Sequence, residues 1–483
     1  MSRKVSADST FASETLLPVV GFLPVLAAAF ALVVGDHGKD TMTIVAVVSF
    51  ASCLLALTRC YLQIGRSTEM PTLVILIAFL FWFYLPAIYT GFSTEQWVGR
   101  KAFVAITNYH AMLAFLAVNT ALFGVCLTAG IRLSRRRSHF LGRPFGSGSI
   151  TANNRNVTIL VAGMAIALVF YVITAGGPGA ALKHILSSRT GAQPWSHKGY
   201  QASSLTPLHV IATSLLTAVA VGAFHLALKS TVSIKRRLVL AMVGVVSVTW
   251  VAVGTGTRSL VIGAVLPPLA LYIRAAMTHR FTRRYSRFLV VGAILVGLLI
   301  ASGIQRSYRR TAKTDAEIVV KIDDNDFMTM TAYAFAVHER EGRFFHDSAV
   351  WHIVTGPIPR VLWKGKPEMT SMLRYTYYVW GIDVSQRGGN TLPSIVGQYY
   401  MSWGWLGVLE LALFLGLIMR LLDNVYWYRR DSDVTHLAIL SFVAYLFSGF
   451  RMLSFSGFAP MLTTVVLCHV LASSARKRKT RSR

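Results

Sequence analysis

The chain has 483 residues, of which 54% are hydrophobic and only 14% are charged. A water-soluble protein carries about a quarter charged residues, so this composition excludes an ordinary soluble domain and indicates a membrane protein. The formal net charge is +28, but the basic residues fall mainly in short gaps between apolar runs. That distribution favours contacts with anionic lipid headgroups and control of orientation over binding to nucleic acid.

Apolar runs long enough to cross a bilayer recur along the chain. An α-helix needs roughly 20 residues to cross about 30 Å of hydrocarbon. The predicted spans are 15–35, 42–63, 72–92, 111–132, 157–175, 206–228, 236–254, 258–277, 287–304, 404–426, 435–450 and 456–473. The predicted fold class is therefore an all-α polytopic membrane protein with about 12 transmembrane helices.

Basic residues gather in alternate gaps between these spans. The main groups are 132–143, 235–237, 280–287, 429–430 and the tail 476–483. Lys and Arg accumulate on the cytoplasmic side of membrane proteins. Because an even number of spans returns the chain to its starting side, both termini are expected to be cytoplasmic.

The gap between spans 9 and 10 has a different composition. Residues 305–395 hold 10 of the 20 Asp and Glu residues and 12 Lys and Arg residues. The sequence thus divides into helices 1–9 (1–304), a large outer loop with partly helical patterns (305–395), and helices 10–12 with a basic tail (396–483). A membrane scaffold has little reason to concentrate its acids in one loop, so this loop is the expected site of chemistry.

Arginines near the outer ends of spans are candidate phosphate contacts. Arg258 follows a Gly-Thr-Gly-Thr turn, and its guanidinium fork can grip a phosphate bidentately. Arg189 lies in a loop with aromatic residues and a histidine, a mixture that suits a sugar-phosphate. Three more arginines stand where the large loop begins: Arg306, Arg309 and Arg310. The alternatives are headgroup anchors for Arg258 and these three, and an ordinary solvated loop for Arg189.

The middle of the large loop contains the candidate general base. His338 and Glu339 are adjacent, and both residue types commonly take a proton from a hydroxyl. On a helix they point about 100° apart, so only one is expected to face the site. His346 and Asp347 are the nearest substitutes. The alternative is a solvated helical face with ion pairs. No metal-binding motif occurs in the loop, and no metal or cofactor is expected.

Aromatic and basic residues continue toward span 10. Arg360, Trp363 and Lys366 lie within an Ile-Pro-Arg-Val-Leu-Trp-Lys-Gly-Lys-Pro stretch, 358–367. A second stretch, Thr391–Gly407, leads into a glycine-containing span. Aromatic faces commonly support sugar rings by stacking, so these stretches indicate a sugar site.

Together with Gly254–Ser259, these two stretches resemble the Wzy-type O-antigen and repeat-unit polymerases of bacterial envelopes. That family is related to O-antigen ligases and, more distantly, to the SEDS peptidoglycan polymerases. The resemblance implies a GT-C-like glycosyltransferase in the bacterial inner membrane. It implies that oligosaccharides linked to undecaprenyl diphosphate are the substrates. A metal is not implied, because arginines hold the diphosphate.

On this resemblance, Arg258, Arg360 and Arg189 are assigned to the diphosphate and His338 or Glu339 to the base. The sugar site is expected to include Trp363, Lys366, Asn390, Gln398 and Tyr399. A chain-length regulator and a flippase are candidate partners, beside membrane lipids.

The chain departs from the family pattern at two places. Arg189 and Gly199 have nine residues between them, where some members have ten, and Gly389-Asn390 stands where ligases often show His-Asn. The nearest alternative is an O-antigen ligase that transfers finished polymer to lipid A-core. Two alternatives from other classes are a polysaccharide or lipid transporter and a structural partner of an envelope complex.

Overall fold

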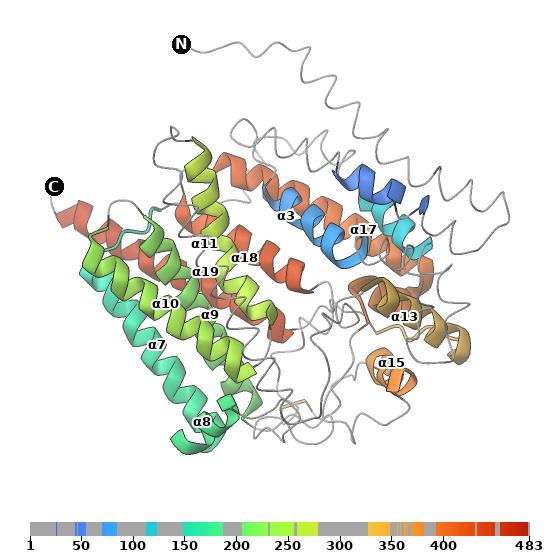
Figure 1. The fold of residues 1–483 in the computed structure, drawn as a ribbon, viewed down its shortest axis with the longest axis horizontal. Helices are drawn as coiled ribbons and strands as arrows, with labels where there is room; N and C mark the ends of the chain where they lie inside the picture. The colour runs from blue at the N-terminus through green and yellow to red at the C-terminus, as the bar shows by residue number, and fades with distance from the viewer. Residues whose placement is uncertain are drawn as a thin grey trace, which may run out of the picture.

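The fold is seen in a computed structural model (Figure 1). It describes residues 26, 44–45, 47–54, 70–84, 113–122, 148–186, 205–229, 232–255, 258–278, 327–347, 355, 358, 362–363, 365, 370–380, 393–429, 432–449 and 455–481. Within these residues the regular elements are helices. The labelled helices are α3 (Met70–Phe79), η1 (Leu80–Tyr84), α7 (Asn154–Ala175), α8 (Pro178–Leu186), α9 (Thr206–Leu228), α10 (Ile234–Thr255), α11 (Arg258–Thr278), α13 (Phe327–Glu341), α15 (Thr370–Trp380), α17 (Ile395–Tyr428), α18 (Asp433–Gly449) and α19 (Phe455–Arg481).

Among the described residues, three helices are both long and apolar enough to cross a bilayer: Asn154–Ala175, Pro207–Leu228 and Ile395–Tyr426. The described part of the chain is helical, and its long apolar helices are consistent with the predicted helical membrane protein. The helices α7, α9, α10, α11 and α18 begin and end within a few residues of predicted spans. The predicted span 287–304, and all of 15–35 except residue 26, lie outside the described residues. The number of about 12 spans stays a prediction.

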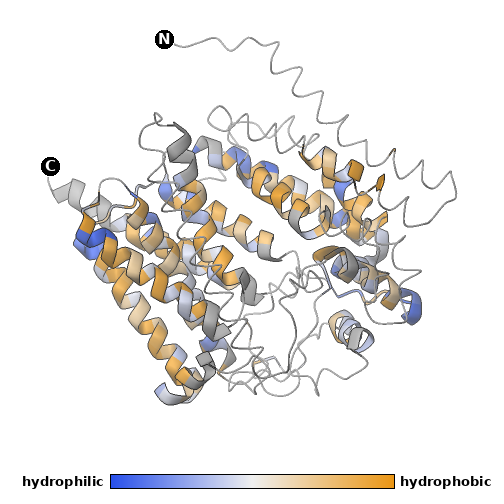
Figure 2. Cartoon of the chain, viewed as in Figure 1, coloured by the Kyte–Doolittle hydropathy of each residue, from blue (hydrophilic) through white to orange (hydrophobic). Residues whose placement is uncertain are grey.

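Helix α7 shows why a membrane environment suits this chain. Its start is capped by the Asn153 side chain, which accepts from the Asn156 backbone N–H at 2.8 Å. It ends at Gly176 in the left-handed conformation, with φ 85°. Between these caps, apolar side chains such as Ile166 and Val169 are half exposed. Exposing such a face to water costs about 25 cal/mol per Å², whereas hydrocarbon chains remove that cost. Figure 2 shows that hydrophobic residues run along most of α7.

Helix α9 is the centre of one group of helices. It packs against α7, α10, α11 and α19, and most of its length is buried. Glycines permit the close packing: a Cβ added to Gly244 of α10 would lie 2.7 Å from the Phe224 ring. In Figure 1, α7, α9 and α10 stand side by side, with α8 at one end.

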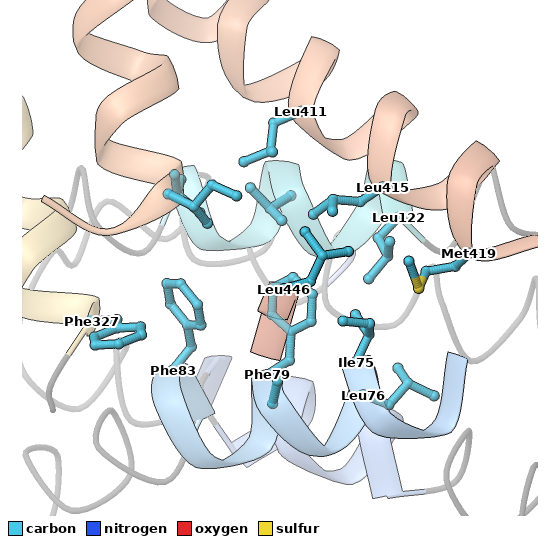
Figure 3. Packing of buried hydrophobic residues seen from close by; sticks show 14 of the residues in the cluster. Ile75, Leu76, Phe79, Phe83, Leu122, Phe327, Leu411, Leu415, Met419 and Leu446 are labelled. Carbon is cyan, nitrogen blue, oxygen red and sulfur yellow. The ribbon is translucent and has the colours of Figure 1, made fainter. Parts of the chain in front are cut away.

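A second group of helices joins α3, η1, α17, α18 and residues 113–122. Ile75, Phe79 and Phe83 project from α3 and η1 toward Leu411 and Leu415 of α17 (Figure 3). These side chains are almost fully buried. Burying a large apolar side chain contributes about 1.5–3 kcal/mol relative to exposure to water; between helices in lipid, close packing takes over that role. This cluster fixes α17 against its neighbours, and α17 in turn carries the candidate site.

Polar contacts at one end of the helices join gaps that the charge pattern assigns to a single side. Asp433 Oδ2 accepts from Lys229 Nζ at 2.6 Å, from the Ile150 N–H at 2.9 Å and from Ser149 Oγ at 3.1 Å. Asp423 accepts from the backbone N–H and hydroxyl of Thr72. Ser149 and Ile150, Lys229, and Asp433 belong to gaps 133–156, 229–235 and 427–434, while Thr72 and Asp423 lie at or near the ends of the predicted spans 72–92 and 404–426. The gaps predicted to share the basic side of the membrane therefore meet in the fold.

Aromatic contacts mark the opposite end of the helices. The Trp82 indole of η1 donates to the Phe447 carbonyl of α18 at 3.1 Å. The same indole stacks on Phe327, with ring centroids 4.7 Å apart. Phe327 is the first residue of α13, so the large predicted outer loop docks directly on this end of the apolar helices.

Candidate functional site

Helix α17 breaks at Gly404, beside Phe344 in the segment that follows α13. The helix begins at Ile395, where the Ser394 side chain accepts from the Gly397 N–H at 3.0 Å. At Gly404 the backbone turns to φ 65° and ψ −146°, a conformation essentially restricted to glycine. The predicted span 404–426 is therefore only the second part of a longer, kinked helix. The break leaves carbonyl groups that need donors from another segment.

The segment after α13 supplies those donors. The N–H of Phe345 donates to the Met401 carbonyl at 3.0 Å, and the N–H of His346 donates to the Ser402 carbonyl at 3.1 Å. His346 takes a left-handed backbone conformation, with φ 54°. The chain after α13 is thus pinned along the kink of α17.

Asp347 joins three elements at this point. Its Oδ2 accepts from the Ser371 N–H at 2.9 Å and from the Ser371 hydroxyl at 2.7 Å, at the start of α15. Its Oδ1 accepts from the Ser402 hydroxyl of α17 at 3.0 Å. A carboxylate that accepts this many hydrogen bonds has a structural function in holding α15 and α17 to the intervening chain. This accounts for Asp347 without a role as base.

Helix α13 packs closely on the first part of α17. A Cβ added to Gly397 would lie 2.7 Å from the Ala334 Cβ, so only glycine permits this approach. The hydroxyls of Thr331 and Ser394 share a hydrogen bond. The ring centroids of Phe335 and Tyr400 are 3.7 Å apart. These contacts determine which face of α13 meets α17.

His338 lies at the end of this packed face. Its ring stacks on Phe344, with centroids 4.0 Å apart and an interplanar angle of 6°, and meets the Tyr400 ring edge-on at 5.6 Å. The His338 Nδ1 is 3.1 Å from the Arg343 carbonyl oxygen. Because a carbonyl only accepts, Nδ1 of the neutral imidazole carries the proton, and Nε2 presents its lone pair. No described residue hydrogen-bonds to Nε2. This arrangement can accept a proton from a bound hydroxyl.

Glu339 follows His338 on α13 but is exposed, whereas His338 is partly buried among aromatic rings. The two neighbours therefore differ in surroundings, as their separation around the helix predicts. The imidazole is oriented by two aromatic contacts and by the contact of one ring nitrogen with a backbone carbonyl.

An aromatic group surrounds the imidazole. Phe335, Tyr400 and Trp405 lie within 5.5 Å of one another between ring centroids. Trp405 is 41% exposed, and Trp403, 42% exposed, meets His346 edge-on at 4.7 Å. Exposed aromatic rings beside a candidate base can support sugar rings by stacking.

Glu341 organises a group of cations beyond the end of α13. Its carboxylate accepts from the Tyr378 hydroxyl at 2.9 Å, and the Nε atoms of Arg343 and Arg374 lie 3.8 and 3.9 Å from it. Desolvation and the hydrogen bond to Glu341 raise the pKa of Tyr378, so its hydroxyl stays a donor. The guanidinium of Arg340 lies 4.7 Å from the centre of the Tyr378 ring.

The other sequence-predicted site residues fall into two groups. Gln398 and Tyr399 are buried in α17. Tyr399 and Tyr400 both belong to the hydrophobic cluster that contains Ile75 and Leu411, and Tyr400 also contacts His338. Trp363 is partly buried, and Arg258 begins α11. Their substrate contacts stay predictions. Seven predicted residues lie outside the described part of the chain: Arg189, Arg306, Arg309, Arg310, Arg360, Lys366 and Asn390.

Several residues that build this site were not assigned to it from the sequence. Phe344, Tyr400 and Arg374 have no motif of their own, and their positions depend on the docking of α13, α15 and α17. A sequence signal for this geometry is the glycine-containing run around Gly404, because glycine permits irregular backbone conformations.

Within the described residues, no group of three or more His, Cys, Asp or Glu side chains has the arrangement of a metal site. Comparisons with protein-family models, curated proteins and solved structures find no match to this chain.

Proposed function

We propose that this chain is a repeat-unit polymerase of the bacterial inner membrane. It transfers a growing glycan from undecaprenyl diphosphate to a hydroxyl of the next lipid-linked oligosaccharide. The observation that supports this best is His338, an oriented imidazole on a helix of the acid-rich loop, docked at the end of apolar helices and surrounded by aromatic rings. The resemblance of 358–367 and Thr391–Gly407 to Wzy-type polymerases supplies the substrate class.

In this proposal, His338 Nε2 takes the proton of the acceptor hydroxyl as its oxygen attacks the anomeric carbon of the donor sugar. The new glycosidic bond forms as the bond from that carbon to the diphosphate oxygen breaks. The diphosphate leaves with the bonding electron pair. A positioned base of this kind typically accelerates a reaction about 100- to 10,000-fold.

Arginines stabilise the negative charge that develops on the leaving diphosphate, and such contacts count for more in a partly dry site. Arg258, Arg360 and Arg189 stay the proposed cations. Arg258 begins α11, three residues after the last residue of α10. The aromatic rings around His338 support the sugar rings of the two substrates.

The proposal requires the large loop to face outward, with both termini cytoplasmic. Thr370 and Ser233 are exposed residues suited to a labelling test, one in the loop and one in a gap of the basic side. We predict that Thr370→Cys reacts with an impermeant maleimide in intact spheroplasts and that Ser233→Cys reacts only after lysis. The background chain lacks the native cysteines Cys53, Cys60, Cys126 and Cys468. The reverse labelling pattern would place the loop inside and remove the mechanism.

A direct assay tests the activity. Purified protein given lipid-linked repeat units is expected to produce lipid-linked polymer, and to do so in the presence of EDTA, because cations of the protein are proposed to neutralise the diphosphate. Turnover that stops in chelator and returns with magnesium would contradict the metal-independent mechanism. A product found only on a lipid A-core acceptor would identify a ligase instead.

A further inference from the structure

Arginine and tyrosine side chains form an exposed patch where the end of α13 meets α15. We call Arg340, Arg343, Arg374, Tyr377 and Tyr378 the arginine patch. They surround Glu341, whose side chain is only 12% exposed. The Arg343 and Arg374 side chains are 61% and 47% exposed, so a ligand from the solvent can reach them.

Contacts within the patch hold the guanidinium groups in place. Arg340 lies over the Tyr378 ring, and Arg343 lies 5.8 Å from the centre of the Phe345 ring. Both ion pairs to Glu341 use Nε, the inner nitrogen of the guanidinium. The terminal nitrogens of Arg343 and Arg374 have no partner among the residues that the structure describes. Groups fixed before binding lose less entropy when a ligand arrives.

The chemistry of the patch suits an acidic sugar. Two guanidinium groups pair with the Glu341 carboxylate and a third lies over the Tyr378 ring, which leaves positive charge for a ligand anion. An arginine fork matches a carboxylate or phosphate. Tyr377 is 48% exposed and meets Tyr378 edge-on at 5.8 Å. An exposed aromatic ring beside cations can stack on a sugar while the cations bind its acidic group.

The position of the patch favours a glycan over a lipid-bound phosphate. Helix α15 packs on α13 and on α17. In Figures 1 and 2 it lies on the far side of α13 from the apolar helix α3. A diphosphate attached to a membrane lipid stays near the apolar helix ends, whereas a glycan extends into water. The Arg343 carbonyl also holds His338, so the patch adjoins the candidate base.

We infer that the arginine patch binds an acidic saccharide, so that the repeat unit handled by this protein carries an anionic sugar. The inference rests on the proposed function for its substrate class. The patch grips the anionic group through its arginines and stacks the sugar on Tyr377. The patch thereby selects the glycan that is accepted, and it lies next to His338, the proposed base.

Binding of defined saccharides tests the inference without any turnover. Full-length protein in phosphatidylcholine nanodiscs is titrated calorimetrically with tetragalacturonate and with maltotetraose, a neutral saccharide of equal length. Tetragalacturonate is expected to bind at least about tenfold more tightly, since hydrogen bonds to charged groups are among the strongest. The Arg340→Gln/Arg374→Gln variant is expected to lose about tenfold in affinity. Tyr377→Ala, a surface change, is expected to weaken binding if the double variant does not fold.

The matched control is Arg155→Gln, which removes an exposed arginine from the start of α7 and is expected to bind like the wild type. Equal binding of both saccharides, or unchanged affinity in both patch variants, would overturn the inference. So would displacement of tetragalacturonate by inorganic diphosphate or by phosphatidylglycerol in the nanodisc, which would assign the patch to a leaving group or to lipid. If the protein binds tetragalacturonate but does not elongate glycan, the inference about the arginine patch holds and the proposed polymerase function is wrong. If it elongates glycan but does not bind tetragalacturonate, the polymerase function holds and the inference about the patch is wrong.

Discussion

His338→Ala is expected to lower the rate of glycan elongation by about 100- to 10,000-fold, the usual contribution of a positioned general base. Glu339→Gln is expected to stay near the wild-type rate. The structure distinguishes these neighbours because His338 is held by Phe344, Tyr400 and the Arg343 carbonyl, whereas Glu339 is exposed. The measurement is single-turnover elongation of lipid-linked repeats, with substrate binding recorded separately.

His469→Ala is the matched control for this experiment. His469 also places Nδ1 near a backbone carbonyl, that of Val465 at 2.9 Å, but it lies on α19 away from the loop. Its replacement is expected to leave elongation unchanged. Severe loss in Glu339→Gln with a mild effect in His338→Ala would move the base to the carboxylate. Near wild-type rates in both variants would make this segment a solvated face and direct the search to Glu368 and Asp383.

Gly404→Ala is expected to reduce elongation by roughly 100-fold, because a displacement of about 1 Å in a reacting group can have that effect. The backbone at Gly404, with φ 65° and ψ −146°, disfavours any side chain by about 1–3 kcal/mol. An added Cβ would also lie 2.6 Å from Phe344 Cζ. Since Phe344 stacks on His338, the clash moves the imidazole. Elongation and thermal unfolding in detergent are the two measurements.

Gly263→Ala provides the control for a glycine change in a helix. Gly263 lies in α11, and beyond the helix's own backbone and its chain neighbours no atom of the described residues lies within 4 Å of an added Cβ. This variant is expected to elongate normally and to unfold at the same or a slightly higher temperature, because alanine favours a helix over glycine. Phe344→Ala/Gly404→Ala removes the clash but retains the backbone strain, so it is expected to recover stability only in part. A Gly404→Ala protein with wild-type activity and stability would show that the kink does not position His338.

Much of the helical arrangement could be predicted from local sequence. An apolar run must be about 20 residues long to cross hydrocarbon, and this requirement makes spans such as 157–175, 206–228 and 236–254 visible in the sequence. The helices α7, α9 and α10 follow these spans closely. The side of the membrane on which each short gap lies could also be predicted from the sequence, because it depends on the Lys and Arg residues within that gap. The contact of Asp433 with Lys229 and Ser149 agrees with this grouping.

The start of α17 and the roles of adjacent residues needed the tertiary structure. Residues 395–403, which are rich in polar and aromatic side chains, precede the predicted span 404–426, yet in the structure they form the first part of the same helix and dock on α13 through Gly397 and Ala334. Likewise, Tyr399 and Tyr400 are equivalent in composition but point about 100° apart. Both are buried in the hydrophobic cluster, and among the described residues it is Tyr400 whose ring also meets His338.

The sequence alone therefore predicted the apolar spans, the basic gaps between them and the candidate residue types, because hydrophobic length and charge are local properties. Packing between α13, α15 and α17 decided the rest. It favours His338 over Glu339 as the base, places Phe344 against the His338 ring, and brings Arg374 to Glu341. Such contacts join residues that are distant in sequence. Their geometry follows from which helix faces bury each other, and no spacing within a single segment encodes that pairing.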